Sequence, residues 1–216
     1  MKIPPYIPTG GIQIHDLSDF IPYLLPADIG FSHGSGWVSR AICKLTQSPN
    51  EPATYANHTF GLGWGGSRIL EALWRVTSSP VGEWDQPPEW EIWRHLYLSW
   101  ERRERIAARA EQREGQPYGP LKIGAHYGDA LLTEIRGEET CFFRKLCRLK
   151  DYPICSWLWG EAYDSQQSPL GKVDYRFASP DDQHDWCCRI PSWAMVAKRY
   201  PSGQIYAFNA VPRRQA

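Results

Sequence analysis

The chain has 216 residues, 24 basic against 24 acidic side chains, and 42% hydrophobic residues. This length suits one large domain, and the apolar content excludes a disordered chain. The zero formal charge argues against a protein held to nucleic acid through its phosphates, which needs a basic surplus. No apolar run approaches the roughly 20 residues of a membrane span, and the first residues lack the apolar core of a signal peptide. We therefore expect a single domain over 1–216, made in the cytoplasm.

The first third of the chain predicts an extended lead-in followed by strands. Residues 1–25 are rich in proline and glycine and form the expected lead-in. A strand is expected at 28–31 and a helix at 37–46, where apolar residues recur at helical spacing. Two short strands, 58–62 and 67–74, flank the sequence Gly-Trp-Gly-Gly, which indicates a β-hairpin.

This hairpin sets a histidine against a carboxylate. If the loop consists of residues 63–66, Leu62 faces Ser67, and the same register places His58 directly opposite Glu71. Directly opposed residues share one face of a sheet, with Cβ atoms about 5 Å apart. We therefore expect the imidazole and the carboxylate to meet.

The middle of the chain predicts helices. Tryptophan and tyrosine recur at steps of three and four over residues 89–114, with arginine and glutamate between them. Mixed charge of this kind is typical of a solvated helix face, and a protein partner is the alternative interpretation. Further helices are expected at 121–135 and 140–149. Residues 85–150 would then be a helical insertion that covers a groove.

The last part of the chain gathers acidic residues, histidine and cysteine. Asp181, His184 and Asp185 stand directly before the pair Cys187-Cys188. Without a secretion signal we expect reduced thiols. Zinc is an alternative, although neither Cys-x5-Cys at 141–147 nor His-x2-Cys at 184–187 has the paired spacing of structural zinc sites. A short helix is expected after residue 193, and 204–210 resembles a closing strand.

Cys155 lies at the start of a predicted helix. Pro153 disfavours helix at the residue before it. The apolar positions beyond it share one helical face: Ile154, Trp157, Leu158 and Ala162. The unpaired N–H groups and the dipole of a helix start favour a thiolate and can bind a developing oxyanion. A histidine oriented by a carboxylate would complete a nucleophilic site, whereas a buried structural thiol is the alternative.

The order of these motifs resembles that of circularly permuted NlpC/P60 proteins, the YiiX/YebB-like, permuted papain-like group. The segments that carry the resemblance are Asp28-Ile29-Gly30, Tyr55 to Leu62, Ile69 to Ala72, and Tyr152 to Tyr163. In that group the strand with the base precedes the nucleophile, as His58 precedes Cys155 here. The chain departs from the family where Ala27 replaces the usual glycine and where Trp157 replaces a frequent glutamate.

The resemblance implies a fold, an activity and three site residues. The fold is α+β, with a small antiparallel sheet of about five strands packed on the helix of the nucleophile. Cys155 would be the nucleophile, His58 the general base, and Glu71 the residue that orients the imidazole. The activity would be hydrolysis or transfer at an amide, ester or thioester through an acyl-enzyme, with no metal or organic cofactor required.

Four further residues are candidate substrate contacts: Tyr55, His33, Trp64 and Trp157. The leading substrate is a peptide, including that of the cell wall, followed by lipid or thioester acyl groups. A cell-wall substrate would require delivery by a phage, by lysis or by a secretion apparatus. The competing hypothesis is a non-catalytic structural or interaction protein, such as one of a phage particle, with the charged helix 89–114 as its contact surface.

Overall fold

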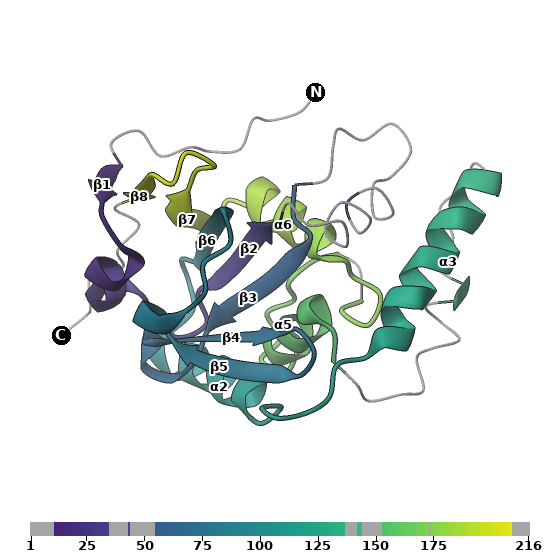
Figure 1. Cartoon of the computed structure of the whole chain (residues 1–216). Coiled ribbons are helices and arrows are strands. Elements are labelled where there is room, and N and C mark those ends of the chain that lie inside the picture. The colour runs from purple at the N-terminus through teal and green to yellow at the C-terminus, as the bar shows by residue number, and fades with distance from the viewer. Residues whose placement is uncertain are drawn as a thin grey trace.

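The computed structural model describes residues 11–34, 43, 55–136, 142–143, 153–172 and 174–208, and these contain one antiparallel sheet of eight strands. The strand order is β1-β8-β7-β6-β2-β3-β4-β5 (Figure 1). The sequence predicted an α+β fold with about five strands, so the class is confirmed and the sheet is larger than expected.

The elements follow one another along the chain with short connections. The strands are β1 (Ile12–Ile14), β2 (Ile29–His33), β3 (His58–Leu62), β4 (Arg68–Ala72), β5 (Val76–Pro80), β6 (Glu89–His95), β7 (Trp193–Arg199) and β8 (Ile205–Ala207). The α-helices are α2 (Trp100–Glu111), α3 (Pro120–Arg136), α5 (Cys155–Asp164) and α6 (Pro180–Arg189). The 3-10 helices are η1 (Leu17–Tyr23), η2 (Trp64–Gly66) and η3 (Val81–Glu83). None of the helices in the described part of the chain has the length and apolar character to cross a membrane.

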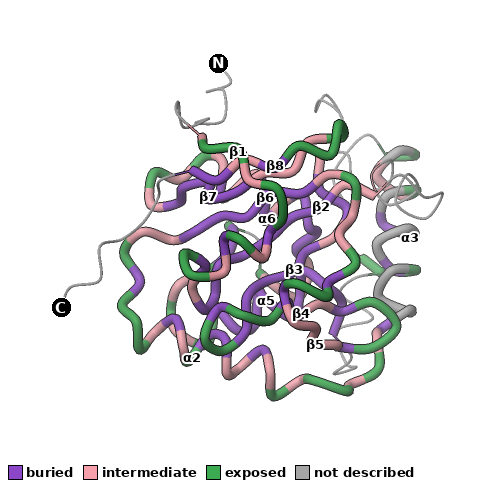
Figure 2. The backbone as a smooth tube through the Cα atoms, turned by 60° about the vertical axis from the view of Figure 1, so that its left-hand side comes forward, coloured by how far each residue is buried: buried purple, intermediate pink, exposed green. Residues whose placement is uncertain are grey.

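Two hydrophobic clusters cover the two faces of the sheet. One contains Ile29 and Leu70 together with residues of α2, α5 and α6. The other contains Phe60 and Ile69 together with residues of η1 and η3. Figure 2 shows the central strands β6, β2 and β3 coloured as buried over most of their length.

The strand β6 lies in the middle of the sheet, where the sequence predicted the first part of a helix. It pairs with β2 on one side and β7 on the other. Trp90 belongs to the cluster on the η1 face and Trp93 to the cluster on the helical face. Because both faces are covered, residues 90–94 are all buried, and the strand lacks the polar–apolar alternation of a half-exposed strand. The expected helix over 89–114 is therefore wrong in its first part.

The helix α2 begins only at Trp100, where the side chain of Ser99 accepts the backbone N–H of Arg102 and caps the first turn. The segment 85–150, expected to be a helical insertion, thus contains a strand of the sheet, β6, before α2 and α3. The expected helix at 121–135 is confirmed by α3.

A buried ion cluster uses two of the arginines that were expected on a solvated face. Asp28 is fully buried directly before β2. Its carboxylate accepts Nε of Arg94 at 2.8 Å and lies 3.4 Å from Nη1 of Arg103. Both guanidinium groups are also buried, so these charges stabilise the junction of β2, β6 and α2 rather than a surface.

Two more arginines of the expected charged face bind α5. The carboxylate of Glu161 accepts Nη2 of Arg109 and Nη2 of Arg113, each at 2.7 Å. These pairs fix α2 against the helix that begins at Cys155. The predicted contact surface of residues 89–114 is therefore divided between the sheet, the core and a helix–helix contact.

Other expectations have mixed outcomes. The strand expected at 28–31 is β2, and the closing strand expected at 204–210 is β8. The helix expected after residue 193 is wrong, because these residues form β7. The lead-in 1–25 contains β1 and η1 in its described part. The helices expected at 37–46 and 140–149 lie almost wholly outside the described residues.

Ala27 explains why a glycine suits the position before Asp28. Its φ is 58°, in the left-handed region that favours glycine. Its N–H donates to the carbonyl of Leu62, and its carbonyl accepts the hydroxyl of Tyr163. These bonds hold the unusual backbone in place.

Candidate active site

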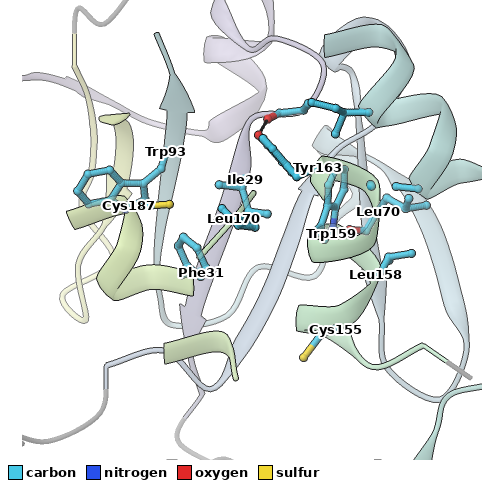
Figure 3. Close-up of a cluster of buried hydrophobic side chains, with 14 of the residues drawn as sticks. Ile29, Phe31, Leu70, Trp93, Cys155, Leu158, Trp159, Tyr163, Leu170 and Cys187 are labelled. Atoms are coloured by element: carbon cyan, nitrogen blue, oxygen red, sulfur yellow. Dashed lines mark hydrogen bonds between the residues drawn. The ribbon is translucent and has the colours of Figure 1, made fainter. Parts of the chain in front are cut away.

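Cys155 is the first residue of α5, as the sequence predicted. The N-cap residue Ile154 is extended and supplies no side-chain cap, and the first intrahelical bond runs from the N–H of Leu158 to the carbonyl of Ile154. The N–H groups of the first turn are therefore available at the thiol. Figure 3 shows the sulfur of Cys155 directed away from Trp159, out of the hydrophobic cluster.

The β3–β4 loop is longer than the sequence analysis expected. Leu62 pairs with Ile69, so the predicted pairing of Leu62 with Ser67 is wrong by two residues. Gly65 and Gly66 have φ of 70° and 69°, and a Cβ on Gly66 would lie 2.6 Å from a backbone carbonyl oxygen. Glycine at these positions allows the positive φ angles, and it lets the loop pass close to the backbone of a neighbouring segment. The turn is therefore wider than the four-residue hairpin loop that the sequence predicted.

His58 and Glu71 nevertheless meet, on a diagonal. Glu71 is the cross-strand partner of Phe60, and His58 stands two residues before Phe60. A register shift of two residues keeps every side chain on its face of the sheet, and diagonal neighbours lie within reach of long side chains. Nε2 of His58 lies 2.9 Å from Oε2 of Glu71, and Nε1 of Trp84 donates to the other oxygen at 3.2 Å.

The thiol and the imidazole shift each other's protonation. Burial opposes charge on both groups. Against it, the charge of Cys155 and the hydrogen bonds with Cys155 and Glu71 raise the pKa of His58 to about 10. The charge and hydrogen bond of His58, and the backbone N–H groups of Thr59 and Ser156, hold the pKa of Cys155 below its ordinary value. A thiolate paired with an imidazolium is the charge state that this arrangement favours.

Tyr118 is a site residue that the sequence analysis missed. Its N–H donates to the carbonyl of Trp74, and the N–H of Gly119 donates to the carbonyl of Pro153. These bonds fix the loop after α2 beside the start of α5. Burial and then the charge and hydrogen bond of Cys155 raise the pKa of Tyr118 well above its ordinary value, so the phenol is a neutral donor at the thiol.

Gln183 of α6 joins the two halves of the site. Its Nε2 donates to the carbonyl of Ser156 at 2.7 Å, and its Oε1 accepts the hydroxyl of Thr59 at 3.2 Å. Ser156 follows Cys155, and Thr59 follows His58. One fully buried amide therefore fixes the helix of the thiol relative to the strand of the imidazole.

Two of the predicted substrate contacts lie away from the thiol. Trp64 is 55% exposed in η2, at the opposite end of β3 from His58. Trp157 is two residues beyond Cys155, about 200° around the helix, and packs between the guanidinium of Arg113 and the ring of Tyr175. The structure therefore does not bring these two tryptophans together with Cys155 and His58.

The other two predicted contacts lie together near α6. Nδ1 of His33 lies 2.7 Å from the carbonyl oxygen of Tyr55, and the two rings stack at 6.1 Å. The ring of Tyr55 also lies 4.7 Å from that of His184. Tyr55 and His33 are therefore part of the packing around His184: His33 lies on β2, the strand next to β3, and Tyr55 lies three residues before β3 begins.

One group of side chains in the described part of the chain has the spacing of a metal site. Ligand atoms of Asp181, His184 and Asp185 lie within 4.8 Å of one another on α6. A histidine with two carboxylates suits a divalent cation. All three already have partners in the chain, since Asp181 accepts the N–H groups of Tyr55 and Ala56, His184 contacts a glutamate, and Asp185 pairs with an arginine.

Comparison with known proteins supports the fold. No protein-family model matches the chain, and no curated protein is similar to it in sequence. Among solved structures, YiiX of Escherichia coli O157:H7, described as a metalloprotein, is similar with a TM-score of 0.57 and 18% identity. The match covers 83% of this chain and 99% of YiiX. The chain thus has a YiiX-like α+β fold.

Proposed function

We propose that the chain is a cysteine hydrolase of the permuted papain-like type, acting through an acyl-thioester intermediate. The observation that carries this proposal is the position of Cys155 at the open start of α5, in contact with an imidazole that Glu71 orients through Nε2. The YiiX-like fold supports it, because the sequence motifs resemble the permuted NlpC/P60 group in the same order. Amides and peptides are the leading substrates, with thioester or lipid acyl groups second.

The proposed reaction assigns one task to each group. The thiolate of Cys155 attacks the carbonyl carbon, and the N–H groups of the first turn of α5 stabilise the oxyanion. The His58 imidazolium gives its proton to the leaving amine, alcohol or thiol as the carbonyl–heteroatom bond breaks. The neutral imidazole then takes a proton from water as the oxygen attacks the thioester, which releases the acid and restores the Cys155 thiolate beside the imidazolium. Glu71 holds the ring in one orientation throughout.

The non-catalytic alternative has less support than the sequence suggested. It depended on a charged helix over 89–114 as a contact surface. Arg94 and Arg103 bind the buried Asp28, while Arg109 and Arg113 bind Glu161. These arginines stabilise the fold itself.

The first test is alkylation, because it requires no choice of substrate. The native protein would be treated with iodoacetamide between pH 4 and 9, and the modified cysteines mapped by mass spectrometry, in the wild type and in His58→Ala. We expect Cys155 to react well below the reference thiol pKa of roughly 8.5, and His58→Ala to slow it. A Cys155 that is inert, or that needs alkaline pH like an ordinary thiol, would contradict the proposed nucleophile.

A further inference from the structure

A second group of thiol, imidazole and carboxylate lies on α6 and β6. Sγ of Cys188 lies 3.5 Å from Nε2 and 3.9 Å from Nδ1 of His184, one helical turn before it. Nε2 of His184 lies 3.0 Å from Oε2 of Glu91. Glu91 and His184 are buried, whereas Cys188 is half-buried. The thiol is thus the outermost of the three groups.

The carboxylate of this group is held firmly. Oε1 of Glu91 accepts Nζ of Lys198 on β7 at 2.7 Å, and Oε2 accepts Nε1 of Trp93 at 3.0 Å. The ring of Tyr55 packs on His184, and the ammonium of Lys198 lies 5.4 Å from the same ring. These two donors and the imidazole hold the Glu91 carboxylate in one position and favour its charged form.

The surroundings of this imidazole favour its charged form. Burial opposes its charge, but the hydrogen bonds and charges of Cys188 and Glu91 raise the pKa of His184 to about 10. An imidazolium beside a thiol favours the thiolate, which is the nucleophilic form of cysteine. The reactive group therefore has a cation on its inner side and access to solvent on its outer side.

We propose that Cys188, His184 and Glu91 form a second thiol site, which exchanges with low-molecular-weight disulfides. In this step the Cys188 thiolate attacks one sulfur of the disulfide, its S–S bond breaks, and the other half leaves as a thiolate that takes a proton from water. One disulfide is lost and one is formed, so no further oxidant is needed. The site is independent of the proposed hydrolase, because no step uses Cys155 or His58.

The neighbouring Cys187 shows that the position on the helix decides the chemistry. Successive residues of a helix point about 100° apart, and Figure 3 shows the sulfur of Cys187 directed into the hydrophobic cluster. Burial, followed by the charges of Cys188 and Glu91, raises the pKa of Cys187 well above its ordinary value. Cys187 is therefore a packing residue and Cys188 the reactive member of the pair.

The test uses the full chain carrying Cys155→Ala, so that the proposed nucleophile does not contribute. This protein would be incubated at pH 7 with 2-hydroxyethyl disulfide, a small uncharged probe, and the mixed disulfides mapped by peptide mass spectrometry over time. Cys43 is the internal reference, because it is also half-buried. Its burial raises the pKa of its thiol above the ordinary value. We expect Cys188 to exchange about tenfold faster than Cys43, because the His184 imidazole lies beside its sulfur and can hold the proton that the thiol gives up on attack.

Two variants in the Cys155→Ala background distinguish activation of the Cys188 thiol by His184 from simple exposure of Cys188 to solvent. His184→Gln removes the cation and should slow exchange at Cys188 about tenfold, with circular dichroism to show that the protein is folded. His33→Gln is the matched control, because His33 also contacts Tyr55 but does not contact the thiol, and it should leave the rate unchanged. If His184→Gln does not fold, Glu91→Gln replaces it and should slow exchange in the same direction. Exchange at Cys188 no faster than at Cys43, or unaffected in the folded His184 or Glu91 variant, would overturn the proposal.

Discussion

His58 and Glu71 meet diagonally across β3 and β4, with Nε2 2.9 Å from Oε2. Because one ring nitrogen is bound to the carboxylate, the other, Nδ1, is left for Cys155. The second oxygen of Glu71 accepts Nε1 of Trp84, so the carboxylate itself is held in place from behind. This chain of contacts determines which ring nitrogen of His58 faces the thiol.

Glu71→Gln should make Cys155 less reactive at neutral pH. The amide can still accept a hydrogen bond from Nε2, but it lacks the charge that favours the imidazolium. We expect the midpoint of the iodoacetamide profile of Cys155 to rise by about one pH unit. The matched control is Glu111→Gln, because Glu111 binds the backbone N–H of Trp64 at the far end of the same hairpin. An equal shift in both variants would show that the hairpin as a whole, rather than the pair, was altered.

Tyr118→Phe should have a similar effect on the thiolate from the other side. The phenol donates to the thiol, and hydrogen bonds to charged groups contribute about 1.5–3 kcal/mol. We therefore expect the pH midpoint for alkylation of Cys155 to rise by about one unit. Tyr206→Phe, on β8 between β1 and β7, is the control and should leave the profile unchanged. A profile unchanged in Tyr118→Phe would remove this hydroxyl from the candidate site.

The candidate site could be predicted from local sequence only in part. The start of a helix at Cys155 follows from Pro153 and the apolar spacing beyond it, because both signals act within a few residues. The meeting of His58 with Glu71 was predicted from a register that was wrong by two residues. It survived because a shift of two preserves the face of each side chain.

Other features depend on contacts that no local pattern carries. The strand β6 was mistaken for helix because Trp90, Trp93 and Tyr97 happen to be spaced by three and four, while burial on both faces removes the alternation of a strand. Tyr118 reaches Cys155 through a loop tied to the β4–β5 turn. Gln183 meets Thr59 across more than a hundred residues of chain. The positions of such residues follow from tertiary packing, which one sequence does not reveal.

Gln183→Met should weaken the fold as well as the site. The thioether fills much of the same volume but removes the bonds to the Ser156 carbonyl and the Thr59 hydroxyl. Leaving buried polar groups without partners should lower the free energy of unfolding by about 2–3 kcal/mol, measured by urea denaturation. Thr59→Val removes only one of these bonds and should lower it by about 1 kcal/mol. Equal losses in the two variants would show that the bond to Ser156 contributes little.

Glu91 should make the stability of the protein depend on pH in the acid range. Burial opposes its charge, but His184 and Lys198 lower the pKa of Glu91 from 4.5 to about 2. A carboxylate whose pKa is lower in the folded state stabilises that state above the unfolded pKa, and the contribution is lost as the pH falls from 4.5 towards 2. A shift of this size corresponds to about 3 kcal/mol at neutral pH.

Urea denaturation of the wild type and Glu91→Gln at pH 6, 4 and 2.5 checks this assignment. At pH 6 the variant should be less stable by about 3 kcal/mol, because it leaves the buried His184 and the half-buried Lys198 without their carboxylate. The difference between the two proteins should shrink as the pH falls, since protonation of Glu91 makes the wild type resemble the variant. Glu89→Gln, in the same strand, should show no such convergence. A difference that stays constant from pH 6 to 2.5 would mean that Glu91 is not the group whose protonation weakens this side of the sheet.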